Sequence, residues 1–207
     1  CSHGVGRWSF DCGCNSGGHW GWHQKWRRPL RETLDWLRDL SYPVYEMQAR
    51  GLVRDPWAAR DAYVDVILQR NEESKSAFLA EHELRPLKPH EQSLLWRLLE
   101  QQRNMMLSYT SCGWFFDDIS GIETAQILQY AARAGELLED CGGPPVEGEL
   151  IERLAQAKSN APEYGDGAGV YRRKVAPSRV DLLKAGANYA IRSLFDSSAE
   201  ITSIGAF

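Results

Sequence analysis

The sequence lacks the features that mark membrane-spanning, sheet-forming and disulfide-stapled proteins. No apolar run approaches the roughly 20 residues that a helix needs to cross a bilayer. Almost no stretch alternates apolar and polar residues, as half-buried strands do. Cysteine is scarce and odd in number, at five residues, and glycines flank the first three. We therefore expect no membrane partner, no disulfide framework, and a reducing compartment, the cytoplasm.

Excess positive charge and the common catalytic signatures are also missing. Lys and Arg total 24 against 28 Asp and Glu, for a net charge of −4, and the arginines are interspersed with acids. We therefore expect no nucleic-acid partner. The chain has no Gly-x-Ser-x-Gly elbow and no His-Glu-x-x-His helix. Residues 165–169 (GDGAG) lack the lysine and the preceding strand of a phosphate-binding loop, so they are predicted to form a turn.

Helical periodicity dominates from residue 27 onward. Leu30, Leu34 and Leu37 recur at helical spacing, and Asp55 followed by a proline is a strong helix start. Pro43 predicts a break or a kink, because proline disfavours helical geometry in the residue before it. The pattern predicts helices beginning at residues 29, 44 and 56, helices over 74–82, 91–109, 121–140, 147–158 and 177–194, and a surface loop over 160–169. The fold class is therefore all-α, a multi-helix bundle.

Residues 1–26, called the arm below, have no usable periodicity and are rich in Cys, His and Trp. We divide the chain into this irregular N-terminal arm and a helical bundle domain over residues 27–207. The chain begins at Cys1 rather than Met, so we expect it to be a processed or excised piece of a longer protein, or one trimmed at its start.

The arm concentrates soft metal ligands. Thiolates and imidazoles are the groups that bind zinc and related transition metals. The spacing departs from the Cys-x2-Cys pattern of common zinc knuckles, and the alternative is that these residues are ordinary thiols and histidines of a Trp-rich segment. If a metal binds, with zinc the expected ion, the preferred ligands are Cys1, His3, Cys12 and Cys14, followed by His19 and His23.

A second candidate lies between the two longest predicted helices, in residues 109–124, called the aromatic–acidic loop below. Trp114, Phe115 and Phe116 precede two adjacent carboxylates, Asp117 and Asp118. Aromatic faces suit the stacking of a sugar ring. Paired carboxylates can perform acid–base chemistry where their environments separate their pKa values. These five residues are the predicted substrate-binding set, together with Glu123.

A structural role competes with this interpretation. Ser120 and Glu123 fit a capping box, in which Glu123 reaches back to the start of its own helix. Asp117 and Asp118 also suit the positive end of that helix. The two interpretations remain open for both aspartates.

Several segments together resemble one family. They are residues 1–8 (CSHGVGRW), 11–14 (DCGC), 24–27 (QKWR), 29–32 (PLRE), 54–61 (RDPWAARD), 109–123 (YTSCGWFFDDISGIE) and 181–195. They are similar to the family of unknown function numbered 3536, found in bacterial proteins related to glycoside hydrolase family 57. The match covers nearly the whole chain, and the 109–123 motif is long and specific.

The resemblance implies a partner and a substrate class. In such proteins an upstream distorted (β/α) barrel carries the catalytic carboxylates of a retaining α-glycan hydrolase or transferase. The chain would be the helical, non-barrel region, and the aromatic–acidic loop would help to close the sugar site. No barrel motif is present here, so no catalytic residue can be assigned. We expect the isolated chain to be inactive; the alternative is a metal-binding structural or protein-interaction module.

Overall fold

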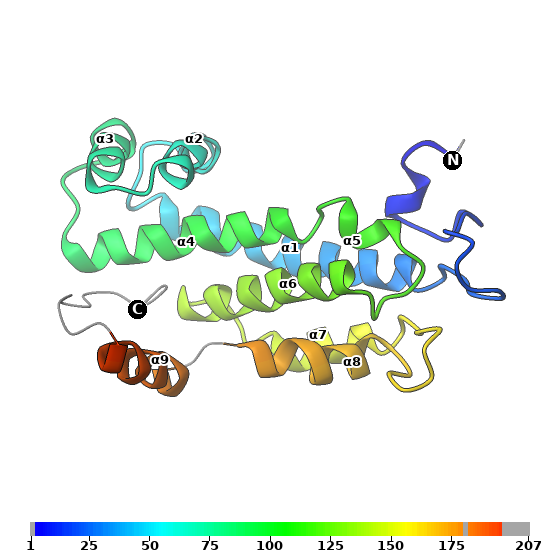
Figure 1. Cartoon of the computed structure of the whole chain (residues 1–207). Coiled ribbons are helices and arrows are strands. Elements are labelled where there is room, and N and C mark those ends of the chain that lie inside the picture. The colour runs from blue at the N-terminus through cyan, green and yellow to red at the C-terminus, as the bar shows by residue number, and fades with distance from the viewer. Residues whose placement is uncertain (1–2, 180–181, 196–207) are drawn as a thin grey trace.

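A computed structural model of the chain describes residues 3–179 and 182–195 and is all-α (Figure 1). Within these residues no strand is present and no helix has the length and apolar character needed to span a bilayer. The helices are η1 (Gly4–Trp8), α1 (Arg27–Ala49), α2 (Pro56–Leu68), α3 (Glu72–His82), α4 (Pro89–Leu107), α5 (Cys112–Phe115), α6 (Ile122–Asp140), α7 (Glu147–Leu154), α8 (Gly167–Val170), η2 (Tyr171–Val175), η3 (Ala176–Ser178) and α9 (Leu182–Phe195).

The long helices α1, α4 and α6 run side by side, and α7, α8 and η2 cover one flank of α1 and α6 (Figure 1). Each of the three long helices presents one apolar face inward, because its large apolar residues recur every three or four positions. Leu30, Leu34 and Leu37 of α1 are fully buried, as the sequence predicts. Trp26 and Trp114 stack near one end of this core with ring centroids 6.5 Å apart.

A second apolar cluster holds α2 and α3 against α4, at the end of the molecule opposite the arm (Figure 1). Phe78 lies at its centre, with ring centroids 6.2 Å from Tyr63 and 5.5 Å from Trp96. Asp55 caps α2 by accepting hydrogen bonds from the backbone N–H groups of Trp57 and Ala58, which confirms the predicted helix start.

The predicted break at Pro43 is wrong, because α1 continues through it to Ala49. A proline inside a helix loses one backbone hydrogen bond, but packing on both sides can hold the helix together. Residues 165–169 do not form only a turn either. Asp166 caps α8 by accepting a hydrogen bond from the Gly169 N–H, so the helix begins at Gly167.

Several apolar residues that helical periodicity places on an inward-facing stripe are exposed. Met106 is 49% exposed because the buried stripe of α4 ends at Met105, one residue and about 100° away. Ile122 is 78% exposed at the first position of α6. On α9, four residues of the predicted stripe are exposed as well: Leu183, Ala187, Ala190 and Ile191. Val180 of that stripe lies outside the described residues.

Candidate functional site

Asp117 is buried where the arm meets the aromatic–acidic loop. Its carboxylate accepts hydrogen bonds from the Ser16 backbone N–H at 2.8 Å, from the Ser16 hydroxyl, and from the Gln24 side-chain amide at 2.9 Å. Its backbone carbonyl accepts a hydrogen bond from the Trp26 indole. All of these donors come from the arm, so Asp117 ties the arm to the loop.

Asp118 is also buried and turns to the other side, toward the segment that follows α7. It accepts hydrogen bonds from the Ser120 N–H at 2.8 Å, the Ser159 hydroxyl at 2.7 Å, and both the N–H and the side-chain amide of Asn160. Burial raises the pKa of Asp118, but the hydrogen bonds from Ser120, Asn160 and Ser159 outweigh it and lower the pKa below its usual value.

The two carboxylates together form a three-way junction, called the aspartate hub below. Asn160 completes it, donating to the His23 carbonyl at 2.8 Å and accepting from the His23 N–H at 3.1 Å. Because Asp117 and Asp118 are 5% and 4% exposed, neither faces solvent to meet a ligand. The structure therefore favours a structural role for the two aspartates. Their carboxylates have different hydrogen-bond partners, so the two side chains lie in different environments.

Trp114, predicted to form part of a sugar-stacking wall, lies in the core and is 1% exposed. It packs on Trp26, and the neighbouring Gly113 carbonyl accepts a hydrogen bond from the Thr124 hydroxyl at 2.7 Å. An indole buried on all sides offers no face to a ligand. Trp114 therefore anchors the loop instead of lining a site on this chain.

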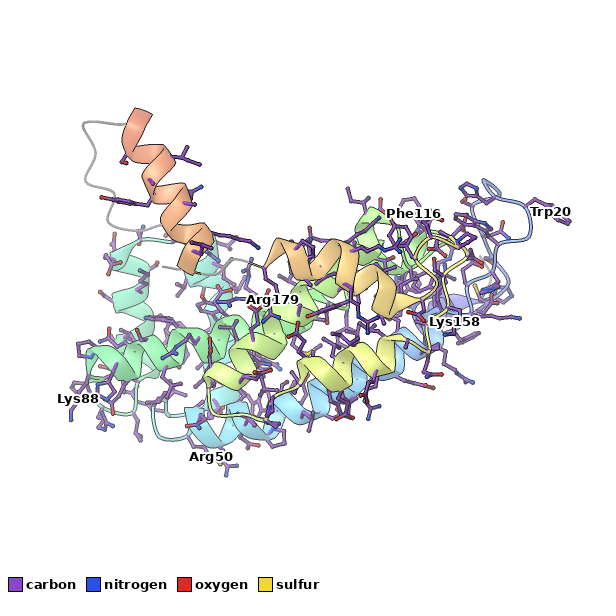
Figure 2. All side chains as sticks on the ribbon, turned by 90° about the horizontal axis from the view of Figure 1, so that it is seen from below. Trp20, Arg50, Lys88, Phe116, Lys158 and Arg179 are labelled. Carbon is purple, nitrogen blue, oxygen red and sulfur yellow. The ribbon has the colours of Figure 1, made fainter. Side chains whose placement is uncertain are left out.

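Phe115 and Phe116 do reach the surface, 48% and 42% exposed, with their rings edge to face at 5.2 Å. Their backbone carbonyls accept hydrogen bonds from the buried Arg27 guanidinium at 3.2 and 3.3 Å. The Arg7 guanidinium lies 4.6 Å from the centre of the Phe115 ring. Figure 2 shows Phe116 at the same end of the molecule as Trp20, which is fully exposed.

The predicted capping box is wrong. Gly121, not Ser120, is the N-cap of α6, and no side chain caps it. Ser120 instead uses its carbonyl to accept a hydrogen bond from the Lys174 ammonium at 2.6 Å. Glu123 is half-buried in the first turn of α6, beside Gly121, and its ligand-binding role stays a prediction.

The arm brings three predicted metal ligands together. The ligand atoms of His3, Cys12 and Cys14 all lie within 4.8 Å of one another, and Cys14 Sγ is 3.4 Å from His3 Nδ1. Cys1 lies outside the described residues. Of the second-choice ligands, His19 stacks on the Trp22 ring at 3.8 Å and does not belong to the group; His23 does not belong to it either.

The environment of Cys12 favours its thiolate. Burial raises the pKa of this thiol, but hydrogen bonds from Cys14 and the positive charge of Arg27 outweigh it and lower the pKa to about 7. Arg27 Nη1 lies 4.0 Å from Cys12 Sγ. The same guanidinium holds the Phe115 and Phe116 carbonyls, so Arg27 connects the sulfur cluster to the aromatic pair.

The sequence did not predict two polar clusters, one around Asp35 and one around Glu100, because each joins residues distant in the chain. The Tyr109 hydroxyl donates to Asp35 at 2.8 Å, and Asp35 also pairs with Arg31 and Arg38. Burial and this hydrogen bond raise the pKa of Tyr109. Next to this cluster is a cavity of about 300 Å³ lined by Arg31, Arg38, Tyr42, Gln102, Met105, Met106 and Tyr109.

A larger hollow of about 410 Å³ lies among α2, α3, α4 and α6. Tyr63 and Trp96 belong to its apolar lining, and Arg70, Lys75, Glu100 and Arg133 form its polar lining. Glu100 is already engaged by the Tyr63 hydroxyl and Arg70. Only a signal linking positions 30 to 37 residues apart could have revealed these contacts.

Residues 22–207 match the model of the family described as domain of unknown function DUF3536. No curated protein and no solved structure matches the chain. Because the matched region spans nearly the whole chain, the protein belongs to this family.

Proposed function

We propose that the chain is the helical, non-barrel part of a family 57-like carbohydrate-active protein and contributes an aromatic surface to a glycan site. The carrying observation is the exposed pair Phe115 and Phe116, 48% and 42% exposed on adjacent positions. Exposed aromatics next to each other have a large apolar area that water does not favour. Their faces suit the C–H-rich faces of sugar rings.

The rigidity of the loop supports this proposal. Arg27 holds both phenylalanine carbonyls, and the aspartate hub fixes the residues that follow. A ligand that meets a rigid surface loses less free energy to ordering the protein. Asp117, Asp118 and Trp114 are thus positioning residues, while Phe115 and Phe116 are the contact residues.

The catalytic groups of the proposed protein belong to an upstream (β/α) barrel. Within the described residues the buried carboxylates are committed to internal hydrogen bonds, so we assign this chain no nucleophile and no general acid. The substrate class is an α-glycan, carried over from the resemblance of residues 109–123. A cytoplasmic location is part of the same proposal and is supported by the sparse, odd-numbered cysteines.

The test uses the natural full-length protein and short α-glucans. Replacing both phenylalanines, Phe115→Ala and Phe116→Ala, should weaken glucan binding about tenfold, or about 1.4 kcal/mol. Calorimetric titration measures it. The matched control is Met47→Ala with Leu68→Ala, two apolar residues that are 64% and 75% exposed far from the loop. Unchanged affinity in the phenylalanine variant would refute the proposal.

A further inference from the structure

We propose that His3, Cys12 and Cys14 bind one zinc ion, and that this ion fastens the arm to the aromatic–acidic loop through Arg27. The proposal does not depend on the glycan contact, because it concerns other side chains and a different ligand. The three residues come from two parts of the arm, with η1 (Gly4–Trp8) between them. They are the metal-binding group found within the described part of the chain.

The spacing of the donor atoms fits zinc. Tetrahedral zinc with sulfur at 2.3 Å and nitrogen at 2.0–2.1 Å places its donors about 3.5–3.8 Å apart. Cys14 Sγ and His3 Nδ1 are already 3.4 Å apart, and the whole set lies within 4.8 Å. The widest separation thus exceeds the tetrahedral spacing by about 1 Å or less. Two thiolates and an imidazole are a donor set that zinc prefers over calcium or magnesium.

The backbone between the two thiols is built for this convergence. Gly13 has φ of +76°, a conformation that other residues rarely adopt, and it reverses the chain between Cys12 and Cys14. The Asp11 side chain stabilises the turn by accepting a hydrogen bond from the Gly13 N–H at 3.0 Å. The turn leaves both sulfurs within reach of one ion.

Apart from Trp8, which packs against the main core, residues 3–21 of the arm bury little apolar surface. Val5, Phe10 and Trp20 are 80%, 44% and 101% exposed. Fixing the backbone costs about 1–2 kcal/mol per residue, which apolar burial ordinarily offsets. Zinc binding supplies free energy directly to folding in segments of this kind. A zinc ion would therefore order the part of the arm that precedes the hydrogen bonds between Ser16 and Asp117.

Arg27 lies beside the Cys12 sulfur and links the proposed site to the aromatic–acidic loop. Its side chain is fully buried, its Nη1 lies 4.0 Å from Cys12 Sγ, and its Nη2 donates to the Phe115 and Phe116 carbonyls. A buried cation needs a nearby negative group. Zinc-bound thiolate provides one, and a hydrogen bond to a ligating sulfur orients that ligand.

The first experiment measures zinc in the full chain, purified under reducing conditions without chelator. Elemental analysis should find one zinc per chain, and cobalt substitution should give the thiolate-to-cobalt charge-transfer bands of a tetrahedral site. Cys12→Ser and Cys14→Ser should each lower the zinc content at least fivefold. The control is Cys112→Ser, an exposed thiol on α5, which should bind zinc as the parent does.

Circular dichroism of each variant shows whether the bundle is folded, and His3→Ala provides a variant that keeps every thiol. We expect His3→Ala to weaken zinc binding at least tenfold in competition with a chelating dye. Zinc content near zero in the parent chain, or zinc loss as large in Cys112→Ser as in Cys12→Ser, would overturn the site.

The second experiment tests the fastening. Hydrogen exchange is compared in the zinc-loaded chain and after zinc removal by a chelator. Exchange should accelerate at least tenfold in residues 3–16 and also at Phe115 and Phe116, while α3 remains unchanged. If zinc removal accelerates exchange in the arm alone, Arg27 does not transmit the ion's effect. The proposal that zinc holds the arm to the aromatic–acidic loop is then wrong.

Discussion

The two ends of the molecule hold their accessory segments in opposite ways. At one end, α2 and α3 pack on α4 through a continuous aromatic cluster that includes Tyr63, Phe78 and Trp96. At the other end, the arm is held by hydrogen bonds to Asp117, with Asp118 holding residues 159–160 beside it.

The difference lies in how each end responds to a local change. Apolar packing depends on area and tolerates small shifts, whereas a buried carboxylate depends on every donor around it. Removing one partner of a buried polar network leaves other groups without hydrogen bonds. We therefore expect the hydrogen bonds that hold the arm to be lost together when one of them is removed. The packing of α2 and α3 on α4 should weaken in proportion to the apolar area removed.

The largest effect is expected for Asp118→Ala. It removes the acceptor for Ser120, Ser159 and Asn160 inside the protein, and we expect it to lower the free energy of unfolding by about 3–5 kcal/mol. Urea denaturation measures this change. Asp61→Ala is the control, because the Asp61 side chain is 67% exposed and its loss should cost less than about 0.5 kcal/mol. Equal destabilisation by both substitutions would show that the aspartate hub contributes no special stability.

Phe78→Ala is the corresponding change at the other end. Phe78 is 6% exposed, and truncating a buried phenylalanine costs about 3 kcal/mol. Hydrogen exchange should accelerate in α2 and α3 but not in the arm, whereas Asp118→Ala should accelerate it in the arm. Accelerated exchange of the arm in the Phe78→Ala variant would refute the independence of the two ends.

Gly113→Ala tests how tightly the aromatic–acidic loop is packed. A Cβ at this position would lie 2.6 Å from Ile127 Cγ2, so a destabilisation of about 2 kcal/mol is expected. Gly148→Ala on α7 is the matched control, because its Cβ meets no atom within 4 Å and alanine favours a helix. Thermal unfolding should separate the two variants by several degrees in Tm; equal Tm values would mean that the loop adjusts freely.

Tyr109→Phe should have a smaller effect. It removes the hydrogen bond to Asp35, which is partly accessible to water and keeps its pairs with Arg31 and Arg38, so about 1 kcal/mol is expected. Urea denaturation is again the measurement. A loss as large as that of Asp118→Ala would place a third critical network in the middle of the bundle.

The smallest effect concerns pH. The pKa of Asp118 is lower in the folded chain than in the unfolded chain, where it is about 3.9. Its ionised form therefore stabilises the fold above that value, and this contribution disappears as pH falls through the folded pKa. The stability difference between the parent and Asp118→Asn should be constant from pH 8 to 5 and shrink below about pH 4. A difference that grows toward acid would mean that Asp118 is protonated in the fold.

The helices were largely predictable because most are marked by capping residues and apolar periodicity within their own sequence. Asp55 and the leucines of α1 needed no knowledge of distant residues, since capping and periodicity act within one or two turns. Met106 and Ile122 were misassigned because helical periodicity gives a face about 100° wide but not its edges.

The site was less predictable because its meaning depends on contacts across the chain. Asp117 and Asp118 stood out as unusual in a connection, but their donors Ser16, Gln24 and Asn160 are 42 to 101 residues away. The cluster of His3, Cys12 and Cys14 was foreseen in composition, since all of it falls within 12 residues, although only the fold shows the donors converging.

The pairing of His23 with Asn160, 137 residues apart, has a consequence for how the protein is made. During synthesis at about 5–20 residues per second, His23 emerges from the ribosome roughly 7–27 s before Asn160. During that interval the His23 backbone has no native partner. The junction between the arm and residues 159–160 can therefore close only after residue 160 has emerged, well after the arm itself.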